Sequence, residues 1–75
     1  MITAFVLATT KSGREKEALS SLQELPEIKE AHTVYGDYDI VLQTETKSID
    51  DLNNFLLKKL RSIQSISATT TMISL

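Results

Sequence analysis

The sequence predicts an α+β fold in the ferredoxin-like order β-α-β-β-α-β, with one antiparallel four-stranded sheet and both helices on one face. Three observations support this prediction. Four short segments have the apolar or β-branched composition of strands, and two longer segments repeat their apolar residues at helical spacing. The single proline, Pro26, and the two glycines, Gly13 and Gly36, fall between these segments. At 75 residues the chain is expected to form a single domain, residues 1–75.

The first strand is predicted over Ile2 to Ala8, and the first helix over Ser12 to about Glu24. The strand is apolar on both pleat faces, which favours a central position with both faces covered. Ser12 and Glu15 fit a capping box at the start of the helix, and Pro26 ends it. One face of this helix carries Ala18, Leu19, Leu22 and Leu25.

A hairpin follows the first helix. Ile28 to about Tyr35 predicts a strand, and Tyr38 to Glu45 predicts the strand that returns. Gly36 and Asp37 between them predict a turn, since glycine readily adopts a positive φ and aspartate tolerates one.

The second helix is predicted over Ser48 to about Leu60, with Ser48 as its N-cap and Asp51 in the capping-box position. The residues from Ser65 to Leu75 are rich in threonine and predict the last strand. Right-handed crossovers then place the first and third strands at the centre of the sheet. The predicted buried stripe of the second helix is Ile49, Leu52, Phe55, Leu56 and Leu60.

Two helices cover only one face of such a sheet, yet the other face is also apolar on the central strands. Phe5, Leu7 and Val41 fall on this second face. We therefore expect it to be buried against an identical sheet, which makes the chain a homodimer with these three residues at the interface.

The composition excludes several classes of function. The chain has no cysteine and one histidine, so disulfides, zinc–thiolate sites, iron–sulfur clusters and multi-histidine metal sites are not expected. A formal net charge of −2 argues against direct nucleic-acid binding. No glycine-rich phosphate loop, membrane-spanning run or signal peptide is visible. We expect a cytoplasmic protein without cofactor, metal or membrane association.

Several polar groups are candidates for chemistry. Asp37 and Asp39 flank the turn and are suited to anchoring a ligand ammonium group, although solvated aspartates are common in turns. The threonines at 69–71 offer hydroxyls that suit a zwitterion, or they simply reflect strand propensity. His32 stands alone, either as a base or as a surface residue. Lys58, Lys59 and Arg61 complement the dipole at the end of a helix.

Four motifs occur in order along the chain: Pro26-Glu27 with Ala31, the hairpin Val34-Tyr35-Gly36-Asp37-Tyr38-Asp39-Ile40-Val41-Leu42, Leu52-Asn53 with Phe55, and Thr69-Thr70-Thr71-Met72-Ile73. Together they resemble the effector-binding domain of the Lrp/AsnC family of feast/famine transcriptional regulators, also called the RAM domain. The resemblance covers essentially the whole chain.

The resemblance implies dimers that pack sheet against sheet and assemble into rings, often octameric, with amino-acid effectors bound between dimers. In this interpretation backbone N–H groups of the turn hold the effector's carboxylate, while Asp37 or Asp39 and threonine hydroxyls hold its ammonium group. The ligand-binding residues implied are Tyr35, Gly36, Asp37, Tyr38, Asp39, Thr69, Thr70 and Thr71.

Two departures from the family pattern shape these expectations. Family regulators carry an N-terminal helix-turn-helix domain, whereas this sequence begins directly with the first strand. We therefore expect a stand-alone RAM protein that does not bind DNA itself and acts by co-assembling with full-length regulators of the family. The residue before the glycine is often threonine in the family, and Tyr35 here is expected to reshape or partly fill the effector pocket.

The leading hypothesis is therefore a non-enzymatic amino-acid-sensing and oligomerisation module. The alternative is a small dimeric ferredoxin-like enzyme that uses His32 or Asp39 as a base. An ACT-like regulatory domain shares the element order, but the hairpin and the threonine-rich ending favour the Lrp/AsnC resemblance.

Overall fold

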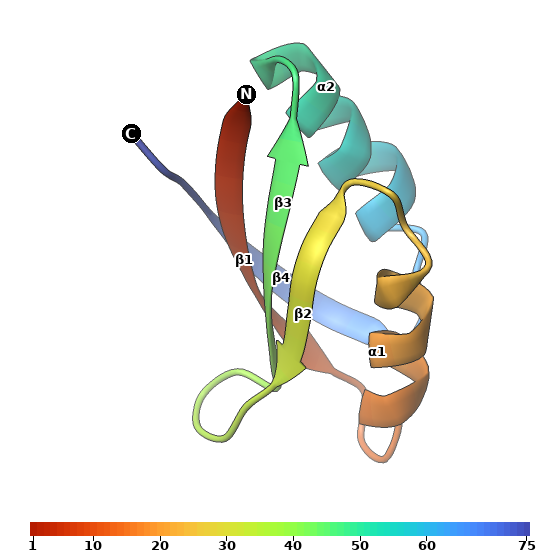
Figure 1. The fold of residues 1–75 in the computed structure, drawn as a ribbon. Coiled ribbons are helices and arrows are strands. Elements are labelled where there is room, and N and C mark those ends of the chain that lie inside the picture. Colours follow the sequence, from red (N-terminus) through yellow and green to blue (C-terminus); the bar gives the residue numbers. More distant parts are fainter.

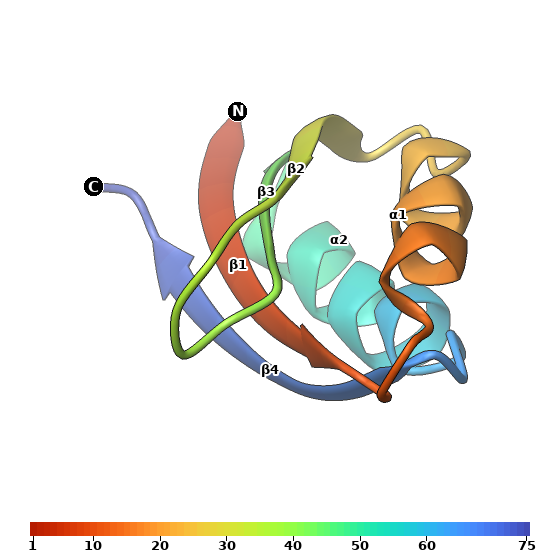
Figure 2. The same ribbon diagram turned by 90° about the horizontal axis from the view of Figure 1, so that it is seen from below.

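A computed structural model describes residues 1–75 and confirms the predicted fold class. The four strands form one antiparallel sheet in the order β2-β3-β1-β4, so β1 and β3 are central as predicted. All helices lie on one side of this sheet (Figures 1 and 2). The elements are β1 (Ile2–Thr10), α1 (Glu15–Gln23), β2 (Ile28–Thr33), β3 (Ile40–Thr46), α2 (Ile49–Asn54), η1 (Phe55–Leu60) and β4 (Ile66–Ile73).

β1 separates the two faces of the sheet. Ala4, Val6 and Ala8 point toward the helices and are fully buried. Phe5 and Leu7 point to the opposite side, which no element of this chain covers, and 37% of Phe5 is exposed. One pleat of the strand is therefore part of the core, while the other lies on a surface that we call the open face.

The core forms between the helices and the covered side of the sheet. Leu22 of α1 and Phe55 of η1 are buried there against Ile40 and Leu42 of β3. The predicted stripe of the second helix is confirmed at Leu52, Phe55 and Leu60, with Leu56 partly buried. The prediction was wrong for Ile49, which is 45% exposed because the first turn of α2 rises beyond the end of β3 (Figure 1).

The two helices begin differently. The Ser48 hydroxyl accepts a hydrogen bond from Asp51 N at 3.1 Å, which confirms Ser48 as an N-cap. The capping box predicted at Ser12 was wrong, because α1 starts at Glu15 and has no side-chain cap. Gly13 has a φ of +78° and forms a turn in which Arg14 N donates to Lys11 O at 3.0 Å. That turn displaces Ser12 from the helix end.

The second helix ends at Leu60 as predicted, but its last six residues, Phe55–Leu60, are a π-helix. In an α-helix, residues five apart lie roughly 140° apart around the axis. Bonds from i to i+5 widen the turn and bring such residues closer to the same side of the helix. This geometry lets Phe55 and Leu60 both bury their side chains in the same core.

Candidate functional site

The segment between β2 and β3 is a longer loop than the sequence predicted. β2 ends at Thr33 and β3 begins at Ile40, so the predicted strand residues Tyr35, Tyr38 and Asp39 lie in the loop Val34–Asp39. Val34 N donates to Asp39 O at 2.8 Å and closes the base of this loop. Gly36 adopts a φ of +118°, which other residues rarely reach.

Asp39 fixes the loop to the end of β1. Its carboxylate Oδ2 accepts hydrogen bonds from Thr10 N at 2.8 Å and from Thr10 Oγ1 at 3.2 Å, while its own N–H donates to Ala8 O at 2.9 Å. The two bonds to Thr10 link residues 29 positions apart in the sequence. Asp39 thus contacts Thr10 through its carboxylate while its backbone bonds to Val34 and Ala8.

Tyr38 connects the loop to the last strand, β4. Its hydroxyl lies 3.4 Å from Thr70 Oγ1 on the last strand. Figure 2 shows the loop on the side of the sheet away from the helices, passing in front of β1 toward β4. Two of the segments singled out from the sequence, the aspartate-containing turn and the threonine run, are thereby brought together.

The threonine run is divided between the two faces of the sheet. Opposed residues of antiparallel strands share a face, and Thr70 is opposite Leu7. Thr69 and Thr71 are opposite Ala8 and Val6, which point toward the helices. Of the three hydroxyls, that of Thr70 therefore lies on the open face beside the loop.

A cavity of about 340 Å³ lies between the loop and the start of α1. Tyr35 and Asp39 line it, together with Thr33, Val34 and Glu15. The contribution of Glu15 was missed because its spacing from Ser12 predicted a capping role. A small molecule in this cavity would meet two carboxylates and a threonine hydroxyl, which suits a ligand with a cationic group. Asp37 and Tyr35 are exposed on the same loop.

His32 has no arrangement around it that would activate a base. Its side chain is largely exposed, and its Nε2 lies 3.7 Å from Glu30 Oε1 on the same strand. No three of the His, Asp and Glu side chains converge in a way that would hold a metal ion. None of the helices has the length and apolar composition needed to cross a membrane.

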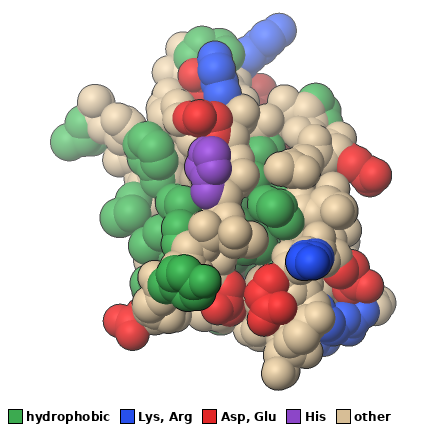
Figure 3. Space-filling view, turned by 60° about the horizontal axis from the view of Figure 1, so that its bottom comes forward, with side chains coloured by type: hydrophobic (Ala, Val, Ile, Leu, Met, Phe, Trp, Pro, Cys, Tyr) green, Lys and Arg blue, Asp and Glu red, His purple; other side chains and the backbone are tan.

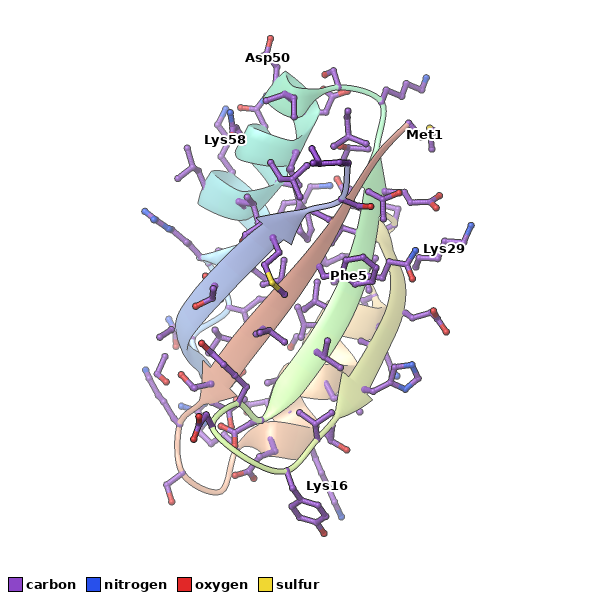
Figure 4. The ribbon with its side chains drawn as sticks, turned by 90° about the vertical axis from the view of Figure 1, so that its left-hand side faces the viewer. Met1, Phe5, Lys16, Lys29, Asp50 and Lys58 are labelled. Atoms are coloured by element: carbon purple, nitrogen blue, oxygen red, sulfur yellow. The ribbon has the colours of Figure 1, made fainter.

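The open face presents an apolar surface built from three strands. In Figure 4 the labelled Phe5 lies on this face in front of the strands, and Figure 3 shows hydrophobic side chains gathered along one side of the molecule. Phe5 is opposite Met72 of β4, and Leu7 is opposite Val41 of β3. Met72 is 50% exposed, so the patch reaches the edge strand.

Comparison with known proteins gives a consistent result. A family model described as the Lrp/AsnC ligand binding domain matches residues 3–75. The HTH-type transcriptional regulator FL11 of Pyrococcus furiosus is 43% identical over 74 residues, which are 99% of this chain and 48% of that protein. Regulatory protein AsnC of Escherichia coli (strain K12) is 33% identical over 75 residues, covering 99% of this chain and 49% of AsnC. The chain thus spans about half the length of these curated relatives.

Solved structures share the fold. The crystal structure of FFRP-DM1 has a TM-score of 0.97 at 43% identity and covers all of both chains. E. coli AsnC has a TM-score of 0.93 at 33% identity, over 99% of this chain and 50% of the other. The NMB0573/L-Met complex from Neisseria meningitidis has a TM-score of 0.89 over 99% of this chain and 49% of the other, and its 20% identity shows the fold alone.

Proposed function

We propose a sensing role for this chain, which belongs to the Lrp/AsnC ligand-binding (RAM) domain family of transcriptional regulators, as its motifs predicted. In this proposal residues 1–75 are one non-enzymatic domain that binds an amino acid and oligomerises. It acts by co-assembling with full-length regulators of the family. The relatives are named as transcriptional regulators, and one protein of the same fold is described as a complex with L-Met.

The observation that carries the proposal is the contact between the loop Val34–Asp39 and the last strand. Tyr38 and Thr70 approach to 3.4 Å, and Asp39 is held by Thr10. A preorganised loop loses less conformational entropy when a ligand binds. In the proposed mode, N–H groups around Gly36 hold the carboxylate of the amino acid. Asp37, the free oxygen of Asp39 and the Thr70 hydroxyl hold its ammonium group.

The ligand-binding residues that we propose remain those implied by the family resemblance. We expect these residues to contribute unequally to binding, because of where they lie. Thr70 lies beside the loop, whereas Thr69 and Thr71 lie on the other face of the sheet. Tyr35 lines the cavity beside the loop with its side chain exposed, and we expect it to select among effectors by size. The full set is Tyr35, Gly36, Asp37, Tyr38, Asp39, Thr69, Thr70 and Thr71.

Dimerisation through the open face is the second part of the proposal. Phe5, Leu7 and Val41 form the centre of this apolar patch, and burying them against a second copy removes apolar area from water. Dimers of this kind leave the loops at the periphery, where further dimers assemble into a ring. The enzyme alternative has no support from geometry, since His32 lacks an activating partner and Asp39 is engaged with Thr10.

The test is a thermal-shift panel with each free amino acid, with the oligomer mass recorded by light scattering on the same samples. A ligand at ~100 times its Kd adds about 2.7 kcal/mol of stability. We expect one amino acid or a small group to raise Tm selectively in the wild type and in Asp50→Ala, an exposed change on α2. Asp37→Ala should lose most of the shift. No selective shift, or an equal shift in both variants, would refute amino-acid binding at the loop.

Co-assembly needs its own measurement. The chain and a full-length family regulator would be mixed and examined by native mass spectrometry. Mixed oligomers are expected, and their number should fall when Phe5 is replaced by a charged residue. Finding only separate homo-oligomers would remove co-assembly as the mechanism.

A further inference from the structure

A second and larger cavity lies at the end of the sheet opposite the loop Val34–Asp39. It measures about 460 Å³ and is bounded by the start of β2, the end of β3 and the second helix. That volume falls in the range of small-molecule sites. The π-helical turns of Phe55–Leu60 form one wall, and such turns occur frequently at functional sites. The sequence analysis assigned no function to this region.

Glu27 is the unusual residue of this cavity. Its Oε2 accepts a hydrogen bond from Lys59 Nζ at 2.6 Å, and 23% of its side chain is exposed. Its second oxygen, Oε1, is buried and has no hydrogen-bond partner in the chain. Burial opposes ionisation, but the hydrogen bond and positive charge of Lys59, with the residue's own backbone N–H, hold the pKa of Glu27 below its ordinary value. A charged carboxylate oxygen is therefore left with an unused acceptor position.

The remaining polar groups of the cavity have both signs of charge. Lys47 and Lys58 line it without an ion-pair partner in the chain, and so does Asp51. Asn54 adds an amide. The lining carboxylates are those of Glu27, Glu45 and Asp51, and the lining ammonium groups are those of Lys47, Lys58 and Lys59.

Because equal numbers of acidic and basic groups meet here, an ion of one sign would leave the other set of charges unpaired. We propose that this cavity binds a small zwitterion, an amino-carboxylate, independently of the loop site. Its ammonium group pairs with the carboxylates of Glu27 and Asp51, and its carboxylate pairs with Lys58 and Lys47. One ligand then gives Lys47, Lys58 and Asp51 the ion-pair partners that the chain does not supply.

The test follows backbone amide signals of the isotope-labelled chain by NMR during titration. The probes are β-alanine and γ-aminobutyrate at millimolar concentrations, and ethylamine, propionate and butyrate are single-charge controls. We expect the zwitterions to shift the amides of Lys47, Asn54 and Lys58 and to leave those of Gly36 and Asp39 unmoved. Asp37→Ala should bind the probes as the wild type does, which separates this site from the loop site.

Variants decide whether the named groups carry the binding. Glu27→Gln and Lys58→Gln should each weaken binding at least tenfold, while Lys16→Gln, on the exposed side of α1 at the other end of the molecule in Figure 4, should not change it. Lys58 is exposed and makes no ion pair, so its variant keeps the test decisive if Glu27→Gln folds poorly. The proposal is overturned if no probe shifts the cavity amides, if a single-charge control binds as tightly, or if Lys58→Gln binds like the wild type.

Discussion

The two faces of β1 are both apolar, yet a single chain covers only one of them. Val6 is fully buried under the helices, whereas its neighbour Phe5 is 37% exposed on the open face. The covered face stabilises the fold of one chain, and the open face has no partner within it. Both pleats of β1 are apolar, but topology decides which of them is buried inside the chain and which is left on the open face.

The largest effect is expected on the covered face. Phe55→Ala removes a side chain that is 2% exposed and should cost about 3–5 kcal/mol of unfolding free energy, because a cavity replaces its packing. Denaturant unfolding followed by circular dichroism measures the change. Leu57→Ala, on the same helix but 57% exposed, should cost less than about 0.5 kcal/mol. Similar losses for both would mean that the helices do not form the core described.

Substitutions on the open face should weaken dimer assembly and leave the fold of the single chain intact. Phe5→Glu places a charge in the proposed interface, so the dimer dissociation constant should rise about 100-fold, or ~2.7 kcal/mol. The monomer should keep its circular dichroism spectrum. Sedimentation velocity over a dilution series measures the dissociation, with Leu57→Glu as an exposed control on the helical side. A Phe5→Glu dimer as tight as the wild type would place the interface elsewhere.

Asp39 anchors the loop Val34–Asp39 to the end of β1. Loss of this anchor should have an intermediate effect on stability. Asp39→Ala removes the acceptor of Thr10 N and Thr10 Oγ1 and should cost about 1.5 kcal/mol. Thermal unfolding should record a Tm lower by roughly 6–12 °C, from about 4–8 °C per kcal/mol in a domain of this size. Asp37→Ala, two residues away and exposed, should leave Tm nearly unchanged. Equal values of Tm for the two variants would argue against the anchoring role of Asp39.

The smallest effect is expected at the rim of the covered face, where Glu27 bonds to Lys59. Because the folded pKa of Glu27 is held below its ordinary value of 4.5, the stabilisation is complete above that value and is lost as pH falls through the folded pKa. At neutral pH Glu27→Gln should lose up to about 1 kcal/mol relative to wild type. Denaturant unfolding at several pH values should show the difference shrinking under acid conditions. Glu24→Gln, an exposed control, should show no such trend.

Much of the fold was predictable because each element has its own local signal. A run that is apolar on both pleat faces identified β1, helical spacing identified both helices, and the β-α-β-β-α-β order placed β1 and β3 at the centre. The errors lie where a local signal competes with a distant contact or with backbone geometry. Ser12 has the spacing of a cap, but the positive φ of Gly13 turns the chain before the helix begins.

The candidate site was predictable in part for the same reason. The residues of the loop and of the last strand stand out in the sequence, but their meeting depends on the contact from Tyr38 to Thr70, 32 residues apart. The cavity around Glu27 has no sequence signature, because its walls come from three separate elements. A buried, unpartnered oxygen becomes visible only when the chain has been folded.

The central position of β1 has a consequence for how the domain folds. β1 pairs with β4 from Ala4↔Ile73 to Thr10↔Ile66, so the first strand to be synthesised needs the last one. Until β4 leaves the ribosome, one edge of β1 has no strand partner, and an unpaired apolar edge is a template for aggregation. Pairings of such long sequence separation also slow folding. The sheet is therefore completed only after translation of the whole domain, and until then the unpaired edge of β1 can template aggregation.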